Sequence, residues 1–430
     1  MAALLDALPW HAAVASPATI WAIAALATLG VILRPFGWPE AIWALAGAGL
    51  LVGLGILEPA EALHGIGKGT DVYLFLTGMM LLSEIARQSG LFDWLAALAT
   101  RRAKGSPTRL FLLIYGVGTL VTIFLSNDAT AVVLTPAVAA AVKAAKAEQP
   151  LPYLLICAFI ANAASFVLPI SNPANLVIYG SHMPPLLQWL PRYALPSALS
   201  ILATYGVLRW TQRDALRQEI EARVPVPILS GGGKTAAFGI AATAIALLAA
   251  SLADTQLGLP TAIAGVLTAA VALIRERQSP WSMIKDISWG VLPLVAGLFV
   301  LVEALDKSGL IRMIAALLQT EARRSVGEAT WGAGIVVAFA CNLMNNLPAG
   351  LMAGSAVQAA QVPEQVTSAV LIGVDLGPNL SVSGSLATIL WLTALRREGQ
   401  TVGAVSFLKL GVLVMPPALL LAIGAAWLVG

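Results

Sequence analysis

Residues 76–98 read LTGMMLLSEIARQSGLFDWLAAL, and residues 295–317 read VAGLFVLVEALDKSGLIRMIAAL. The two stretches align at a constant offset in the numbering (295 − 76 = 219), with a glutamate five positions before a Ser-Gly pair in each. Any two membrane helices share leucine, alanine and glycine, but contact with lipid does not explain a shared glutamate and a shared Ser-Gly turn. The pair therefore predicts an internal repeat, which decides the architecture of the chain.

Two further matches extend the repeat outward from this pair. Upstream, GWPEAI at 37–42 resembles GLPTAI at 258–263, and downstream Asn127 falls on Asn346 (346 − 127 = 219). Between the halves lies a polar, charged stretch with a Ser-Gly-Gly-Gly run, which is typical of a solvated linker. The predicted organisation is an N-terminal lead (1–17), a first transmembrane repeat (18–210), a cytoplasmic linker (211–235) and a second transmembrane repeat (236–430).

The composition places these repeats in a membrane. The chain of 430 residues is 58% hydrophobic and 11% charged, whereas a soluble domain is about 25% charged. Apolar runs of about 18 residues, long enough to span a bilayer, recur along its length. The net charge of +3 is spread over short loops, so no nucleic-acid partner is expected, and no cofactor is predicted. Cys157 and Cys341 lie inside apolar runs, which argues against a disulfide framework or a zinc cluster.

Each half has the same order of segments: three spanning runs, an amphipathic stretch, two segments interrupted by polar residues, and a last span. If the first interrupted segment is a re-entrant hairpin, each half crosses the membrane five times and the second half is inverted. The predicted fold is an all-α polytopic membrane protein with two inverted repeats of five spanning helices each. Every repeat then contains one re-entrant hairpin and one broken helix.

The distribution of basic residues orients this scheme. With the N-terminus outside, 19 of the 25 lysines and arginines are cytoplasmic (25 − 6 = 19), as the positive-inside rule requires. Both termini are then outside and the linker is inside. The six external basic residues are Lys68, Arg192, Lys307, Arg312, Arg323 and Arg324.

Polar backbone at membrane depth is tolerated only where it is buried in protein or lines a cavity. Four such breaks occur, at 126–130, 171–175, 345–348 and 375–385, in corresponding positions of the two halves. Paired breaks of this kind are the best sequence indication of a transporter's binding site. Serine, asparagine and aspartate also begin helices, which directs free N–H groups and the positive helix end into the cavity.

Asparagine amides both donate and accept hydrogen bonds, so they suit a ligand with several hydroxyls. The alternative for each polar side chain is that it only caps a helix. The candidate substrate-binding residues are Ser126, Asn127, Thr130, Ser171, Asn172, Asn175, Asn345, Asn346, Gly377, Ser383 and Ser385.

Carboxylates inside the membrane are costly and are therefore functional candidates. Asp128 and Asp375 lie in the breaks and are the predicted proton-coupling residues, because the cost of an ionised carboxylate at that depth favours proton uptake. The alternative for Asp128 is a helix cap. Glu84 and Glu303 lie near the ends of their spans and are expected to pair with basic residues in the scaffold.

The motifs DLGPNLSVSGSLATILWL (375–392), MNNLPAG (344–350) and SNDATAVVLTP (126–136) resemble the arsenite efflux permease family, ArsB, of the ion-transporter superfamily. The stretch 381–383 departs from the family, which often has a proline and an apolar residue there. The resemblance implies efflux of arsenite and antimonite, as neutral As(OH)₃ and Sb(OH)₃, driven by proton entry across the bacterial cytoplasmic membrane. It also implies an optional soluble arsenite-stimulated ATPase as partner.

Two other kinds of transport remain open at this point. A sodium/proton antiporter or a carboxylate transporter of the same superfamily would share the architecture. A membrane enzyme is disfavoured, because the sequence contains no HExxH, Walker A or suitably placed Ser–His–Asp set.

Overall fold

The computed structural model describes residues 16–180 and 183–430, and within these ranges the regular structure is helical, with no β-strand. The predicted all-α class is thereby confirmed. Most of the predicted N-terminal lead, residues 1–15, lies outside the described residues.

Among the described residues, the first half starts with α3, whose N-terminus is capped by the side chain of Ser16. They are α3 (Pro17–Leu33), α4 (Glu40–Gly53), α5 (Pro59–Lys68), α6 (Thr70–Gln88), α7 (Leu91–Ala103), α8 (Pro107–Phe124), the π-helix η2 (Ala129–Leu134), α9 (Thr135–Ala144), α10 (Leu151–Ala163), η3 (Pro169–Ser171), α11 (Pro173–Tyr179) and α12 (Leu186–Thr211).

The linker carries one short 3₁₀ turn, η5 (Ala215–Arg217), and the second half follows it. Its helices are α13 (Gly231–Leu252), α14 (Gly258–Glu276), α15 (Pro280–Asp286), α16 (Val291–Lys307), α17 (Leu310–Arg324), α18 (Val326–Met344), α19 (Asn346–Ala360), α20 (Glu364–Leu376), η6 (Gly377–Asn379), α21 (Leu386–Arg397) and α22 (Ala404–Val429).

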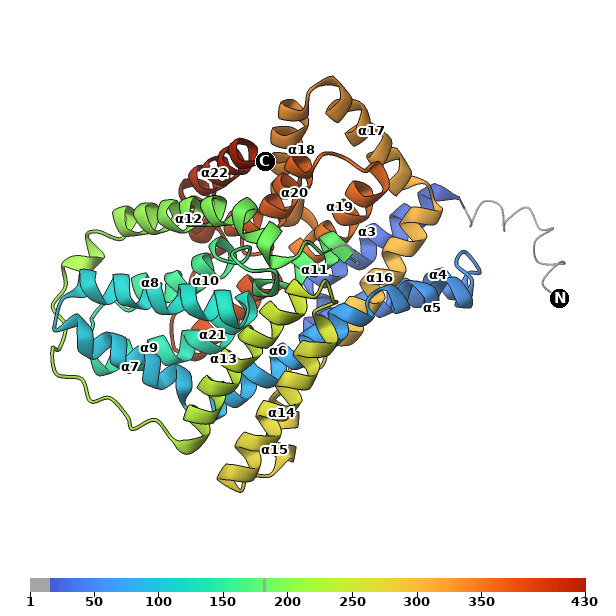
Figure 1. The fold of residues 1–430 in the computed structure, drawn as a ribbon. Coiled ribbons are helices and arrows are strands. Elements are labelled where there is room, and N and C mark those ends of the chain that lie inside the picture. Colours follow the sequence, from blue (N-terminus) through green and yellow to red (C-terminus); the bar gives the residue numbers. More distant parts are fainter. Residues whose placement is uncertain (1–15, 181–182) are drawn as a thin grey trace.

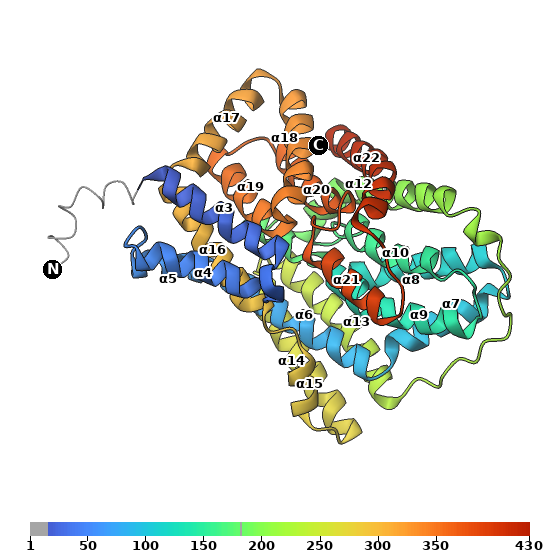
Figure 2. The ribbon, with the colours of Figure 1, turned by 180° about the vertical axis from the view of Figure 1, so that it is seen from behind.

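The second half repeats the helix order of the first. The offset found in the sequence relates the first residues of α7 and α17 (310 − 91 = 219) and also the last residues of α6 and α16 (307 − 88 = 219). Contacts between the halves repeat as well: α6 packs on α14, and its counterpart α16 packs on α4. Helices α12 and α22, the last of each half, pack on each other (Figures 1 and 2).

The matched glycines Gly78 and Gly297 explain part of this symmetry. A Cβ at Gly78 would collide with the backbone of Thr261 in α14, and a Cβ at Gly297 would lie 2.8 Å from the backbone of Ala44 in α4. Each glycine therefore lets the third long helix of its half approach the backbone of the other half closely.

Five helices in the described ranges are long and apolar enough to cross a membrane unaided: α8, α13, α14, α18 and α22. A sixth results if α15 and α16, bent by 43°, count as one span. Helix α10 has 13 residues, or about 20 Å at 1.5 Å per residue, short of a hydrocarbon core of about 30 Å. It is therefore too short to cross alone, as is α20, which also has 13 residues. Five crossings per half, and their inversion, stay predictions.

Glu84 occupies the expected scaffold position at the end of α6. Arg87 donates to it through Nε at 2.9 Å, and Gln88 donates at 2.7 Å. Arg87 also pairs with Asp286 of α15, with Nη2 and Oδ2 2.7 Å apart. The carboxylate thus helps to fasten the end of α6 to the short helix of the other half.

Glu303 has the equivalent place at the end of α16. It pairs with Lys68 of α5 at 2.7 Å, while Lys307 pairs with Glu61 of α5 at 2.6 Å. The basic partner of Glu303 is thus Lys68. Both glutamates tie a long helix to a short one across the halves, which is a structural role.

Candidate transport site

The second break of the first half, 171–175, lies after α10 and includes the start of α11. Asn172 has an extended backbone, its Oδ1 accepts from the backbone N–H of Ala174 at 3.0 Å, and Pro173 is the first residue of α11. These are the features of a helix start. The amide Nδ2 of Asn172 donates to Oδ1 of Asp375, so the cap of one half binds the carboxylate of the other.

The second break of the second half is built in the same way. Here the residue numbers of the two halves differ by less than the 219 found elsewhere. Helices α10 and α20 are related by an offset of 213 at both ends (364 − 151 and 376 − 163). The same offset pairs Asn172 with Ser385, which caps α21 by accepting from the N–H of Thr388 at 3.1 Å. It also pairs Asp375 with Asn162, a residue that the sequence analysis did not single out.

Asn162 lies at the end of α10 and forms a second bridge between the halves. Its Nδ2 donates to Oδ1 of Asn379 at 3.0 Å, and Nδ2 of Asn379 donates to the carbonyl of Phe159 at 3.1 Å. The amides of Asn162 and Asn379 therefore join α10 to η6. The bond from Asn172 to Asp375 joins α11 to α20.

Three oxygens in this region accept no hydrogen bond from the described residues: Oδ1 of Asn162, Oδ1 of Asn175 and Oδ2 of Asp375. The hydroxyl of Ser165 lies beside Asp375, but it donates to the carbonyl of Asn162 at 2.7 Å. The three residues are 1%, 0% and 0% exposed, respectively. An unpaired buried acceptor costs about 1–3 kcal/mol. We call these three residues the acceptor cluster, because each leaves a buried oxygen that a hydrogen-bond donor could satisfy.

In the first break, Ser126 caps the chain that continues into η2. Its Oγ accepts from the N–H of Ala129 at 3.2 Å, and Oδ1 of Asn127 accepts from the N–H of Asp128 at 2.9 Å. Asp128 itself has helical backbone angles and no capping hydrogen bond. The alternative reading of Asp128 as the cap is therefore wrong, and its carboxylate bonds to none of the described residues.

The third break is tied to the fourth. Asn345 has φ 73°, and its Oδ1 accepts from the N–H of Leu347 at 3.4 Å at the start of α19. The backbone N–H of Asn346 donates to the carbonyl of Gly384 at 2.8 Å. The side chain of Asn346 is 6% exposed and has no hydrogen bond within the described ranges.

Two other candidate substrate-binding residues, Ser383 and Gly377, stabilise the backbone around the fourth break. Oγ of Ser383 donates to the carbonyl of Asn342 at 2.9 Å, and Nδ2 of Asn342 donates to the carbonyl of Gly377 at 2.9 Å. A Cβ at Gly377 would collide with the backbone of Ala338, so glycine is required for contact with α18.

In the first half, the side chains of Thr130 and Ser171 stabilise the backbone of the breaks in the same way. The hydroxyl of Thr130 lies 2.8 Å from that of Thr122 on α8, and Oγ of Ser171 donates to the carbonyl of Ile123 at 3.0 Å. Their hydroxyls therefore fasten the first and second breaks to the C-terminal end of α8.

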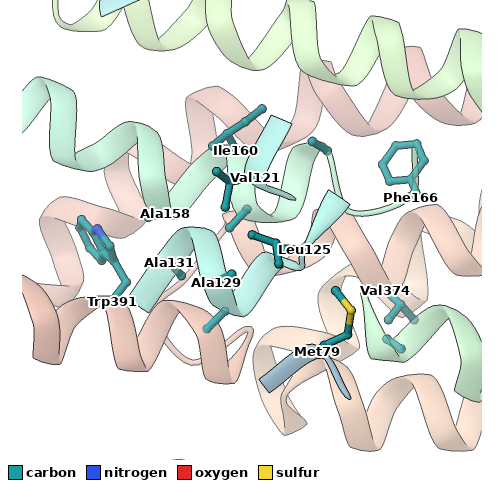
Figure 3. Packing of buried hydrophobic residues seen from close by; sticks show 14 of the residues in the cluster. Met79, Val121, Leu125, Ala129, Ala131, Ala158, Ile160, Phe166, Val374 and Trp391 are labelled. Atoms are coloured by element: carbon teal, nitrogen blue, oxygen red, sulfur yellow. The ribbon is translucent and has the colours of Figure 1, made fainter. Parts of the chain in front are cut away.

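The short helices bring all four breaks into one assembly. Helix α11 contacts α19, and α21 contacts η2 and α9. Helix α10 contacts α20, α21 and η6. Figure 3 shows the apolar packing in this region, including Leu125, which precedes the first break, Ala129, which lies within it, and Val374, which precedes Asp375.

Comparison with known proteins supports a transporter. Residues 20–376 match the CitMHS family, described as citrate transporter. The arsenical pump membrane protein of Escherichia coli K12 is 26% identical over 428 residues, covering 94% of this chain and 97% of that one. The arsenical pump membrane protein of Yersinia enterocolitica is 27% identical, covering 81% and 83%. A putative arsenical pump membrane protein of Bacillus subtilis is 25% identical, covering 90% and 93%.

Two solved structures share the fold. The YdaH transporter of Alcanivorax borkumensis has a TM-score of 0.56 and 16% identity, covering 85% of this chain and 86% of that one. MtrF of Neisseria gonorrhoeae, described as illuminating a class of antimetabolite efflux pumps, has a TM-score of 0.53 and 15% identity, covering 89% and 84%. The chain is thus a multi-pass membrane transport protein that belongs to the CitMHS family and is similar over most of its length to bacterial arsenical pump membrane proteins.

Proposed function

We propose that this protein exports the neutral trihydroxy acids As(OH)₃ and Sb(OH)₃ in exchange for protons. The acceptor cluster is the observation that carries the proposal. Its three oxygens lack donors, and each of these acids carries three O–H groups that must donate when the molecule leaves water. Similarity to arsenical pump membrane proteins supports the same substrate.

The chemistry of the cluster disfavours citrate. A buried carboxylate ligand needs cations or N–H donors in its site, whereas the acceptor cluster includes a carboxylate of its own. No lysine or arginine in the described ranges is buried. Sodium/proton antiport is the second candidate, because carboxylate and amide oxygens also suit a small hard cation.

Proton coupling follows from competition at one oxygen. A proton on Oδ2 of Asp375 converts it from an acceptor into a donor, which removes one of the three acceptors that hold the substrate. In the outward-facing state, proton binding releases the acid; in the inward-facing state, proton loss restores the site. Asp128, whose carboxylate bonds to no described residue, is the alternative proton carrier.

The proposal includes a topology and a location. The repeated helix order and the distribution of lysine and arginine support two inverted repeats, with both termini outside and the 211–235 linker in the cytoplasm. The membrane is the bacterial cytoplasmic membrane. A soluble arsenite-stimulated ATPase is an optional partner that would dock on the cytoplasmic face.

Everted membrane vesicles test the function. The lumen of such vesicles corresponds to the cell exterior, so an acidic lumen should drive accumulation of As(III) and leave Na⁺ and citrate at equilibrium. Vesicles without the protein are the control. Accumulation of Na⁺ under the same gradient, with no As(III) uptake, would establish the second candidate instead.

A further inference from the structure

A cavity lies between α12, α20 and α22, and none of the three residues of the acceptor cluster lines it. Its volume is about 300 Å³, and its polar lining is Gln188, Arg192, Glu364, Gln365 and Ser368. At about 30 Å³ per molecule, it has room for about ten waters. It is therefore large enough for a small hydrated solute.

An ion pair crosses the rim of this cavity. Arg192 of α12 pairs with Glu364, the first residue of α20. The side chain of Glu364 is 62% exposed and that of Arg192 is 18% exposed. Arg192 lines the cavity. Its guanidinium therefore places N–H donors in the cavity wall, and these complement the lone pairs of a hydroxyl ligand.

A chain of three hydroxyls begins at the cavity wall and leads away from it; we call this chain the floor. Ser368 lines the cavity and is 1% exposed. The hydroxyl of Tyr193 donates to its Oγ at 3.2 Å, and the hydroxyl of Tyr179 lies 2.6 Å from that of Tyr193. Trp189 packs on Tyr193 with ring centroids 4.3 Å apart, which fixes the tyrosine in place. The floor is thus a narrow polar layer between aromatic rings.

Helices α20 and α11 connect this floor to the acceptor cluster. Ser368 and Asp375 are seven residues apart on α20, which places them on one face at about 10 Å separation. Tyr179 is the last residue of α11, and the cap of α11, Asn172, bonds to Asp375. The cavity and the cluster therefore lie at opposite ends of α11 and of the C-terminal part of α20.

We propose that this cavity is the outward vestibule through which the trihydroxy acid leaves. The hydroxyls of Ser368, Tyr193 and Tyr179 form the barrier between the vestibule and the acceptor cluster. This assignment rests on the proposed function and on its topology, which places the start of α20 and the end of α22 outside. Movement of α11 and α20 relative to α12 would part the three hydroxyls and open the way.

Cysteine accessibility tests the vestibule separately from transport. In a Cys157→Ala, Cys341→Ala background, Gln365→Cys places a thiol in the cavity wall. Gln361→Cys, on the exposed turn before α20 and outside the lining, is the matched control. A charged, membrane-impermeant methanethiosulfonate is added to intact cells or to everted vesicles, and labelling is read by mass.

Both thiols should react from outside and neither from the cytoplasmic side, and only the adduct in the cavity wall should block As(III) export. Labelling of the Gln365→Cys variant from the cytoplasmic side alone, or an adduct that leaves export unchanged, would overturn the assignment. Should Gln365→Cys fail to fold, Gln188→Cys on the opposite wall replaces it. If the parent protein moves no As(III), the proposed function fails, while the side and rate of labelling still decide whether the cavity opens outward.

Discussion

Replacing Asp375 by asparagine is the sharpest perturbation that the site offers. The change is isosteric, and the new amide oxygen can still accept from Asn172, as Oδ1 of Asp375 does. The unpaired oxygen Oδ2 becomes an NH₂ group, which donates instead of accepting. The variant therefore keeps the bridge between the halves and removes one acceptor together with the titrating group.

The size of the effect follows from the bond that is lost. A hydrogen bond to a charged group contributes about 1.5–3 kcal/mol. At about 1.4 kcal/mol per factor of ten, the apparent affinity for As(III) should fall roughly 10- to 150-fold. Export driven by a pH gradient should disappear, because the group that exchanges the proton is gone, while exchange of As(III) down its own gradient should persist at high concentration.

Two assays on everted vesicles separate these effects. Uptake under an acidic lumen measures coupling, and counterflow of As(III) at equal pH measures binding and exchange. Wild-type pH dependence in Asp375→Asn would assign the proton to Asp128. Wild-type behaviour in both Asp375→Asn and Asp128→Asn would refute the reasoning and transfer the coupling to Glu84 and Glu303.

Three further predictions follow from the fold and the breaks. Asn127→Ala and Asn346→Ala should each lose a neutral hydrogen bond to substrate worth about 0.5–1.5 kcal/mol. The apparent affinity should then fall roughly 2- to 13-fold. Normal transport by both folded variants would show that these amides face no common path. Cysteines at Ser16 and at Ile228, which is 96% exposed in the linker, should label from opposite sides of the membrane, and labelling from one side rules out five crossings per half. Glu303→Gln should lower the free energy of unfolding by about 1 kcal/mol, as expected for a partly exposed ion pair, and leave the pH dependence of export intact; loss of coupling without loss of thermal stability would contradict a structural role.

Much of the scaffold could be predicted from the repeated stretches. The constant offset located the turns before α7 and α17 and the glycines at the contacts between the halves, because these positions depend on local turns and close backbone approach. The four breaks were also found, since polar residues at membrane depth stand out against apolar flanks.

The hydrogen-bond partners of the side chains in the breaks could not be predicted from the sequence. Asn162 was missed because the offset is shorter in the second break, where the paired segments have turns of different length. Ser383 was chosen as a ligand, but its hydroxyl donates to the carbonyl of Asn342. A single sequence does not show which hydroxyl meets a carbonyl and which oxygen of Asn175 or Asp375 is left without a donor.

The position of bound arsenic tests the central claim most directly. Crystals of the protein grown with As(III) can be measured on both sides of the arsenic absorption edge, and the anomalous difference locates the atom without reference to the protein chain. One peak is expected at the junction of α10, α11 and α20, with the hydroxyls on arsenic within hydrogen-bonding reach of Asp375, Asn175 and Asn162. A peak bonded to the sulfur of Cys157 or Cys341, or one remote from all four breaks, would contradict that claim.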